Sequence, residues 1–321
     1  MTRPVLLDVD TGIDDALALM LAVRHPDLDV RGVTCVAGNT SVDQVVRNTL
    51  TVLDAAGAVH VPVARGAERP LLAASRDASH VHGQDGLGDL GLPYSTRQPV
   101  DVHAVELMRQ QLLVSSTPVT VIGLAPLTNL ALLLRTYPEA AAMIERIVVM
   151  GGSASVGNAT PVAEFNVWHD PEAAAIVFSA DLPVTMYGLD VFYQVAVDGD
   201  DAAKLAVSAD AGTSLIGRLL SGQVDNSRSE DRLLPGTATL GDAGAVCAVA
   251  DPAGLVTESL PVRVSLEGEE TRGQTIVDRR SRAGESDLLG RVAAPRIDVA
   301  LEVDAARYRR MFLDVACQGV V

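Results

Sequence analysis

The sequence predicts an α/β fold with an open, mostly parallel central sheet flanked by helices, formed by residues 1–321 as a single domain. Short apolar runs rich in β-branched residues alternate with longer helical patterns along the chain. Strands that alternate with helices form βαβ units, which give parallel sheets. The strand runs are apolar at nearly every position, which is typical of a sheet covered on both faces.

The expected elements follow one another without repeats or a low-complexity linker. Strands are expected at the apolar runs that begin at Val5, Val30, Val119, Arg146 and Val184, and again at 262–268 and 296–304. Helices are expected at 14–24, 42–56, 102–114, 127–137, 171–178 and 305–317.

Two polar stretches interrupt this alternation. Residues 62–99 form a stretch rich in Gly, Arg and Asp that we interpret as a long loop, and residues 221–241 form a second stretch that we interpret as a flap. Long irregular segments in compact domains usually serve function. We therefore expect both to border a functional site.

Composition excludes several classes of function. The net charge of −16 argues against nucleic acid as a partner, since that affinity needs clustered Lys and Arg. No apolar stretch is long enough to span a membrane, and the opening segment lacks the pattern of a secretory signal, so we expect a cytoplasmic protein. The three cysteines show no spacing typical of disulfide frameworks or zinc sites.

Four carboxylates lie together near the N-terminus. In VLLDVDTGIDDALALMLAV, Asp8 and Asp10 share one face of a strand, and Asp14 and Asp15 open the next helix. Thr11 and Asp14 also match a capping box, but a helix cap accounts for only part of the cluster. Burying several like charges is costly without a cation or protons, and α/β proteins place ligands at the carboxyl ends of parallel strands. We therefore expect a metal ion here.

The ligand chemistry narrows the choice of metal. Carboxylate oxygens favour a hard ion such as Ca²⁺ or Mg²⁺ over zinc, and a cage with several carboxylates favours Ca²⁺.

The segment LLDVDTGIDDALALMLA resembles the D-x-D-x-x-x-D-D signature of the inosine-uridine-preferring nucleoside hydrolase family. Further matches follow in the same order along nearly the whole chain. They are VAGNTSVDQVVRN with Asn39, HVHGQDGLGD with His82, GLAPLTNLALLL, VMGG with Met150, GNATPVAEFNVWHDPEAA with Asn158, Glu164, Phe165 and Asn166, and LGDAGAVCAVADP with Asp242.

The resemblance implies the nucleoside hydrolase fold, a homodimer or homotetramer, and a nucleoside bound on a Ca²⁺ ion. Asn39 would lie near the reacting centre, Met150 and Phe165 would line the pocket, and Asp8 would support the site from behind. The implied metal ligands are Asp10, Asp15, Asp242 and the main-chain carbonyl of Leu124. The implied ribose ligands are Asp14, Asn166 and Asp242 for the 2′ and 3′ hydroxyls, with Asn158 and Glu164 for the 5′ hydroxyl.

The implied reaction is hydrolysis of the N-glycosidic bond of a ribonucleoside to ribose and free base. Its transition state resembles an oxocarbenium ion, so the enzyme needs an activated water and help for the departing base. A metal ion lowers the pKa of bound water, and Asp10 can take its proton. We expect Asp10, Asn39 and His82 to be the catalytic residues.

One position departs from the family pattern. In the best-known members a histidine that contacts the leaving base precedes the late metal-binding aspartate, and here that position is Gly241. Leaving-group activation would then fall to His82, to the flap or to solvent. Because only 3% of the residues are aromatic, a stacked purine cage is harder to build. The sequence alone therefore leaves open which base the preferred nucleoside carries.

Two other functions are weighed against hydrolysis. A haloacid dehalogenase-type phosphatase also begins with strand-D-x-D, with Asp8 as nucleophile and Asp10 as acid. Its motif has Thr or Val where this chain has Gly12, and its catalytic lysine would have to be Lys204, in an Ala-rich helical segment. A non-catalytic nucleoside- or ribose-binding protein is the other alternative. Gly241 motivates it, and retention of Asp10 argues against it.

Overall fold

A twisted sheet runs through the molecule in the computed structural model, which describes residues 2–226, 235–280 and 293–318. Within these residues the sheet has nine strands in the order β10-β9-β11-β6-β5-β4-β1-β2-β3. All neighbours from β11 to β3 pair in parallel, and β9 pairs antiparallel with both β11 and β10. The strands are β1 (Arg3–Val9), β2 (Leu28–Cys35), β3 (Val63–Arg65), β4 (Val119–Gly123), β5 (Ile144–Met150), β6 (Val184–Tyr187), β9 (Leu255–Val264), β10 (Thr275–Val277) and β11 (Arg296–Val303). The predicted open, mostly parallel α/β fold is confirmed.

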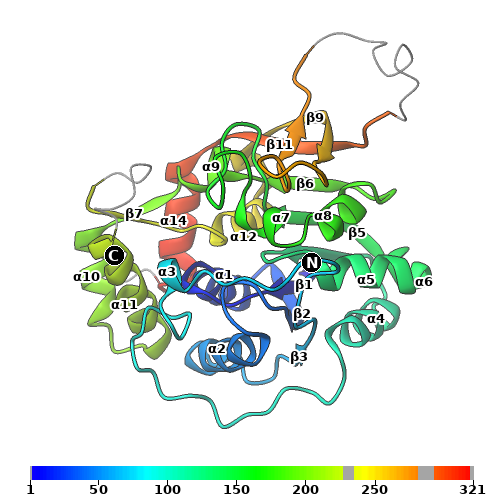
Figure 1. Ribbon diagram of the computed structural model, residues 1–321. Coiled ribbons are helices and arrows are strands. Elements are labelled where there is room, and N and C mark those ends of the chain that lie inside the picture. The colour runs from blue at the N-terminus through cyan, green and yellow to red at the C-terminus, as the bar shows by residue number, and fades with distance from the viewer. Residues whose placement is uncertain (1, 227–234, 281–292, 319–321) are drawn as a thin grey trace.

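Helices cover both faces of this sheet, as Figure 1 shows. In β1, Val5 and Leu7 belong to one apolar core and Leu6 belongs to the other, so neither face of the strand reaches water. This explains why the strand is apolar at successive positions. The first core contains residues of α1 (Ile13–Arg24), α2 (Val42–Ala55), α12 (Ala243–Ala250) and α14 (Ala305–Val315), and the second contains residues of α4 (Ala104–Val114), α5 (Thr128–Thr136), α6 (Pro138–Ala141) and α8 (Pro171–Phe178).

The two polar stretches are more ordered than expected. The segment 62–99 is not a continuous loop, since it contains β3 and the short helix α3 (Ser79–His82). The segment 221–241 begins as the last residues of α11 (Ala211–Asn226) and ends with β8 (Thr237–Thr239), which pairs with β7 (Ala196–Asp198). Its residues 227–234 lie outside the described part of the chain. Between β6 and α11 the chain also forms α9 (Leu189–Phe192) and α10 (Gly199–Ala206).

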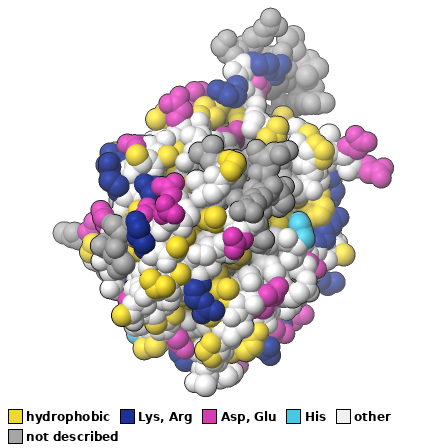
Figure 2. Space-filling view, turned by 90° about the vertical axis from the view of Figure 1, so that its left-hand side faces the viewer, with side chains coloured by type: hydrophobic (Ala, Val, Ile, Leu, Met, Phe, Trp, Pro, Cys, Tyr) yellow, Lys and Arg dark blue, Asp and Glu magenta, His cyan; other side chains and the backbone are white. Residues whose placement is uncertain are grey.

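Charged side chains of both signs share the surface. On the face shown in Figure 2, Lys and Arg side chains stand among acidic and apolar ones. Several basic side chains pair with carboxylates, as Arg309 does with Asp198 at 2.8 Å and Arg65 with Asp43 at 2.7 Å. In the described residues, none of the helices is both long and apolar enough to cross a membrane.

Candidate active site

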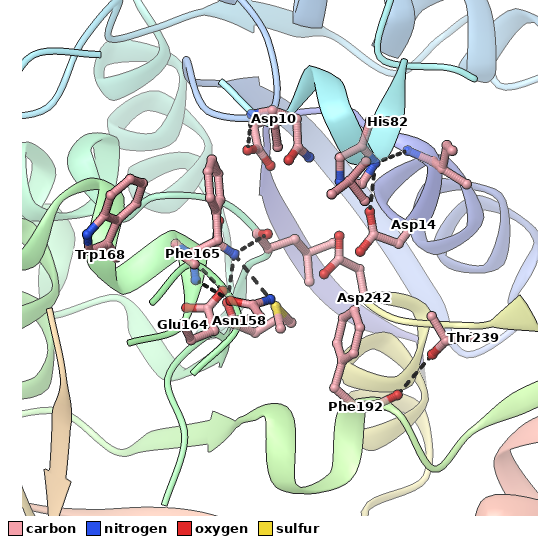
Figure 3. Close-up of a pocket in the computed structure, with 18 of the residues that line it drawn as sticks. Asp10, Asp14, His82, Asn158, Glu164, Phe165, Trp168, Phe192, Thr239 and Asp242 are labelled. Atoms are coloured by element: carbon pink, nitrogen blue, oxygen red, sulfur yellow. Dashed lines mark hydrogen bonds and ion pairs between the residues drawn. The ribbon is translucent and has the colours of Figure 1, made fainter. Parts of the chain in front are cut away.

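The carboxyl ends of the parallel strands meet at a cavity of about 650 Å³. Asp10 follows β1, Asn39 lies beyond β2, Leu124 follows β4, and Met150 is the last residue of β5. Asp242 reaches the same cavity from the N-terminus of α12. Figure 3 shows Asp10 and Asp242 reaching the cavity from different elements. The ends of a parallel sheet are where this class of fold binds ligands.

The turn between β1 and α1 is held by Asp15. Its carboxylate accepts the N–H groups of Gly12 at 2.9 Å and Asp10 at 3.2 Å, which satisfies donors at the start of the helix. The predicted capping box of Thr11 and Asp14 is wrong. Thr11 instead shares a hydrogen bond of 2.6 Å with the buried hydroxyl of Thr49, so its side chain turns away from the helix terminus.

This local arrangement sends Asp14 into the cavity. Oxygens of Asp14, Asp15 and Asp242 lie within 4.8 Å of one another. Asp10 lies beside this group, and its Oδ2 accepts the backbone N–H of Asn39 at 2.7 Å. The predicted metal set shares Asp15 and Asp242 with the cluster, and Asp14, predicted for the ribose hydroxyls, joins them.

Burial and mutual repulsion disfavour the charged forms of the carboxylates in this cluster. Burial and the neighbouring Asp14 raise the pKa of Asp15 to about 8. Burial, and then the charge of Asp15, raise the pKa of Asp10. Burial, and then the charges of Asp14 and Asp15, raise the pKa of Asp242. A divalent cation would relieve this repulsion, and the all-oxygen donor set fits a hard ion.

Asn39 connects the parts of this cluster. Its backbone N–H binds Asp10, and its Nδ2 donates to Asp15 Oδ2 at 3.2 Å. Its own carbonyl accepts the N–H of Ala78, from the segment that leads into α3. Asn39 therefore fixes two carboxylates and one wall of the cavity at the same time.

A second polar group comes from the start of α7 (Phe165–His169). Glu164 is the N-cap of this helix and accepts N–H groups from Gly152 at 2.9 Å, Asn166 at 2.8 Å and Val167 at 3.0 Å. Burial raises the pKa of Glu164 to about 7. Asn158 is exposed at the rim, and its Oδ1 accepts the N–H of Phe165 at 2.9 Å.

Asn166 joins this group to the floor of the cavity. Its Nδ2 donates to the carbonyl oxygens of Leu124 at 2.9 Å and Met150 at 3.1 Å. A carbonyl oxygen has two lone pairs, so the Leu124 carbonyl can accept Asn166 and still face a cation.

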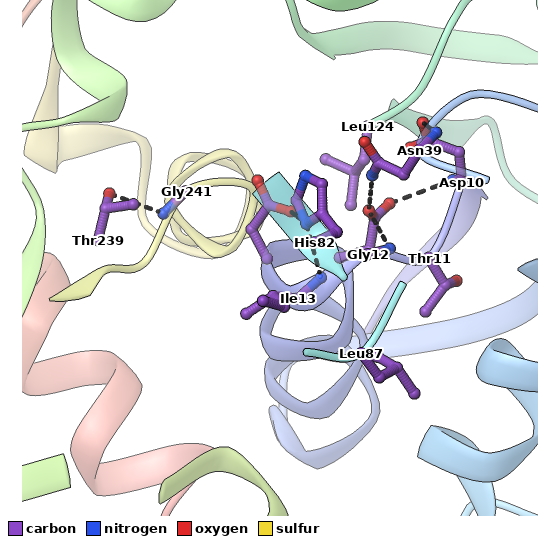
Figure 4. Close-up of polar contacts among 12 residues, drawn as sticks. Asp10, Thr11, Gly12, Ile13, Asn39, His82, Leu87, Leu124, Thr239 and Gly241 are labelled. Carbon is purple, nitrogen blue, oxygen red and sulfur yellow. Dashed lines mark hydrogen bonds and ion pairs between the residues drawn. The ribbon is translucent and has the colours of Figure 1, made fainter. Parts of the chain in front are cut away.

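His82 lies on the opposite side of the cavity, at the end of α3. Its Nδ1 accepts the N–H of Ile13 at 3.1 Å (Figure 4) and lies 3.9 Å from Asp14 Oδ1 (Figure 3). With Nδ1 acting as the acceptor, the hydrogen of the neutral imidazole resides on Nε2. The N-terminus of α1 thereby orients the ring and selects its tautomer.

Aromatic side chains are concentrated in this cavity. The chain has four Phe, five Tyr and one Trp. Of these, Phe165, Trp168, Phe192 and Tyr193 line the cavity. Four aromatic side chains therefore line the cavity, although aromatic residues are few in the chain as a whole.

Several further lining residues are not singled out by the sequence, among them three aromatic ones. Trp168 lies within GNATPVAEFNVWHDPEAA, one of the segments that resemble the family, but the resemblance gives it no role. Phe192 and Tyr193 lie just beyond the carboxyl end of β6, and that position could have indicated that they reach the cavity. Gln223 of α11 and Thr239 of β8 lie within the stretch 221–241, which the sequence predicts to border the site, although neither residue is singled out there.

The phosphatase alternative does not fit this geometry. Asp8 is completely buried and accepts hydrogen bonds from Thr34 at 2.7 Å and Asn129 at 2.8 Å, and it does not line the cavity. Lys204 is exposed and pairs with Asp201 on α10. A Cβ at position 12 would lie 2.6 Å from both Asn39 Nδ2 and His82 Nδ1, so the Thr or Val of that motif would clash here.

The fold and the site together define an α/β enzyme with an acidic, aromatic-walled cavity at the carboxyl ends of its parallel strands. Residues 5–310 match the model of the inosine-uridine preferring nucleoside hydrolase family, and the chain belongs to this family. It is therefore an N-ribohydrolase, as the motifs implied.

Individual relatives cover nearly the whole chain. The chain is 41% identical over 284 residues to the pyrimidine-specific ribonucleoside hydrolase RihA of Shewanella sp. (strain ANA-3), covering 88% of this chain and 89% of the relative. It is 37% identical over 318 residues to RihA of Escherichia fergusonii, covering 99% and 98%.

Solved structures show the same fold. The plant nucleoside hydrolase PpNRh1 superposes with a TM-score of 0.90 at 29% identity, covering 99% of each chain. The purine-preferring ribonucleoside hydrolase from Gardnerella vaginalis superposes with a TM-score of 0.87, also at 29% identity and 99% coverage of each chain.

Proposed function

We propose that this enzyme hydrolyses the N-glycosidic bond of pyrimidine ribonucleosides, with Ca²⁺ in its acidic cluster. The observation that carries the proposal is the convergence of Asp14, Asp15 and Asp242 oxygens within 4.8 Å at the floor of the cavity. Buried carboxylates at this density need a cation, and carboxylates around a ribose favour the positive charge that develops on its ring.

The ribose hydroxyls have ligands on two sides of the cavity. Asp14, Asn166 and Asp242 lie at its floor and would bind the 2′ and 3′ hydroxyls. Asn158 and Glu164 lie where α7 begins and would bind the 5′ hydroxyl. Binding energy from these groups orients the sugar and can be used to distort it towards the transition state.

The residues present fit a Ca²⁺ ion, held by Asp10, Asp15, Asp242 and the carbonyl of Leu124. When bound, such an ion lowers the pKa of a coordinated water and orients it. Asp10 Oδ1 is the atom that would take the proton from the attacking water, because Oδ2 accepts the N–H of Asn39. Asn39 holds the Asp10 carboxylate in place for this transfer.

His82 would assist the departing base. Its Nδ1 is occupied by the Ile13 N–H, so Nε2–H is the group that can donate a hydrogen bond or a proton. The choice of pyrimidines is supported by the relatives named pyrimidine-specific, which are more similar in sequence than the solved structure named purine-preferring.

The proposal also covers the oligomeric state of the protein and its place in the cell. We expect a homodimer or homotetramer in the cytoplasm, as the family resemblance suggests. Light scattering of the purified protein measures the first, and fractionation of cells that express it measures the second.

The proposal is tested by measuring release of reducing sugar from uridine, cytidine, inosine and adenosine. We expect uridine and cytidine to be cleaved fastest, and Asp10→Asn to lower kcat by about 10²- to 10⁴-fold, the usual contribution of a general base. Asp29→Asn, which alters a partly exposed carboxylate on β2 outside the cavity, is the matched control and should retain activity.

The alternatives give different results in the same assay. Phosphate release from a nucleoside monophosphate without ribose release would indicate a phosphatase. Binding of ribose without turnover of any N-riboside would indicate a binding protein.

A further inference from the structure

The geometry points to Phe192 as the residue that selects the base, by closing the cavity beside Gly241 with a rigid aromatic wall that fits a single-ring base. This inference rests on the proposed binding of ribose. Phe192 is the last residue of α9, lines the cavity and is only 8% exposed.

The shape of a ribonucleoside decides which end of the cavity receives the base. In the ribose ring, C1′ carries the base and C4′ carries the 5′ carbon, and these two atoms flank the ring oxygen on opposite sides. If Glu164 and Asn158 hold the 5′ hydroxyl, the base extends away from α7. In Figure 3, Glu164, Asn158 and Trp168 lie towards the left, whereas His82, Asp14, Asp242, Phe192 and Thr239 lie towards the right. The base would therefore lie on the side of the cavity that His82 and Phe192 line.

Phe192 occupies the space that a side chain at position 241 would use. A Cβ on Gly241 would lie 2.9 Å from Phe192 Cζ and 2.7 Å from Asp14 Cβ. Gly241 also has a φ of +53°, in the left-handed region that glycine adopts most easily. The histidine expected before Asp242 from the family resemblance thus has no room here, and the tip of the phenyl ring stands in its place.

Hydrogen bonds and ring packing hold Phe192 in place. Thr239 Oγ1 donates to the carbonyl of Phe192 at 3.1 Å (Figure 3) and accepts the N–H of Gly241 at 3.2 Å (Figure 4). One hydroxyl therefore holds Phe192 and Gly241 together. Leu240 N–H donates to Val195 O at 2.8 Å. The Phe192 ring packs edge-on against Tyr193, with centroids 5.0 Å apart.

A braced phenyl ring offers a flat apolar contact and no hydrogen-bond donor. It can pack against the π-face or edge of a base, while hydrogen bonding is left to other groups such as His82 Nε2. A pyrimidine has a single ring, which would occupy the space between His82 and Phe192. A purine brings a second ring that must displace Phe192 or tilt away from His82, and close-packed walls resist such displacement.

The test is the ratio of kcat/KM for uridine to kcat/KM for inosine in Phe192→Ala. We expect this ratio to fall by about 10- to 100-fold, the range over which pocket size discriminates between substrates. Phe192→Leu keeps an apolar side chain of similar depth and should give an intermediate ratio. Inhibition by free ribose should be unchanged in both variants, because the ribose ligands are not altered.

Phe165→Ala is the matched control, since Phe165 lines the same cavity from the α7 side. It should change kcat/KM for uridine and inosine by the same factor. An unchanged ratio in both Phe192 variants with normal ribose inhibition would overturn the inference and leave the proposed function standing. Loss of ribose inhibition in both Phe192 variants would also overturn it, because Phe192 would then support the sugar. A wild-type enzyme that releases no ribose from any nucleoside would reject the proposed function and the inference with it.

Discussion

Asp15 accepts two backbone N–H groups at the start of α1 and also contributes its carboxylate to the acidic cluster. One residue thus fixes the turn and supplies charge to the site. His82 is positioned in a comparable way, because the Ile13 N–H at the same helix terminus holds its ring. At this scale, the chemistry depends on backbone groups that no sequence motif displays.

His82→Ala should lower kcat for uridine by about 100-fold or more, since general acid assistance to a poor leaving group is lost. With p-nitrophenyl β-D-ribofuranoside, whose leaving group departs without a proton, the variant should stay within about threefold of wild type. His80→Ala, an exposed neighbour on α3 that also lines the cavity, is the control. Equal losses on both substrates would contradict the assignment of His82 to the leaving base.

The polar residues predicted from the sequence largely line one cavity, but the sequence does not show all of their partners. The carboxylates around Asp10 were recognisable because four of them cluster in eight residues and match a family signature. The cap was misassigned because Thr11-x-x-Asp14 and Gly12-x-x-Asp15 overlap, and only the fold shows that Thr11 meets Thr49. Phe192 carries no pattern of its own, since its role follows from a contact with Gly241 that is 49 positions away in the chain.

Strand β1 lies in the interior of the sheet, and Asp10 of the candidate site follows its carboxyl end. It pairs with β2 and β4 on its two sides. Asn129 of α5 reinforces this position, because its Nδ2 donates to Asp8 Oδ1 at 2.8 Å and to Cys35 O at 3.0 Å. The same side chain accepts the N–H of Ala67, so it joins β1 to the ends of β2 and β3.

Asn129→Ala should lower the free energy of unfolding by about 1–3 kcal/mol, the cost of leaving buried polar partners unsatisfied. Urea denaturation measures this change. Gln110→Ala removes an exposed amide that bonds to Glu106 on α4, and it should stay within about 0.5 kcal/mol of wild type. If the two variants were equally stable, Asn129 would not hold these elements together.

Element prediction succeeded where periodicity was strong. The helices expected at 14–24, 42–56 and 171–178 are found within one residue of their predicted bounds. The helix expected from 102 begins at Ala104, because His103 is its N-cap and accepts the N–H of Val105. The sequence does not predict the short elements that hold Phe192 in place. α9, β7 and β8 have three or four residues each, too few to show a period, and β7 pairs with β8 across about 40 residues of chain.

The whole molecule carries a charge of −16 and buries several of its carboxylates. Burial raises the pKa of Asp15 to about 8 and those of Asp8 and Glu164 to about 7, from ordinary values near 4. Between about pH 4 and pH 8 the folded protein without metal binds more protons than the unfolded chain, because these carboxyl groups stay protonated only when folded. Its stability therefore falls as the pH rises through this range.

The metal-free protein should therefore be less stable at pH 8 than at pH 5, with a midpoint temperature lower by about 3 °C or more. Calcium binds the ionised carboxylates, so saturating Ca²⁺ should raise the midpoint more at pH 8 than at pH 5. Thermal unfolding in EGTA and in excess Ca²⁺ at both pH values measures this. A metal-free midpoint that rises from pH 5 to pH 8 would contradict the account of the buried carboxylates.

The most direct test of the central claim is uridine hydrolysis before and after metal removal. The protein is treated with EGTA, its residual calcium is measured by mass spectrometry, and ribose release is followed as Ca²⁺ is added back. We predict that activity disappears with the metal and returns in proportion to calcium bound, reaching a plateau near one ion per chain. Full ribose release from protein shown to contain no divalent metal would contradict a metal-dependent N-ribohydrolase built on Asp10, Asp15 and Asp242.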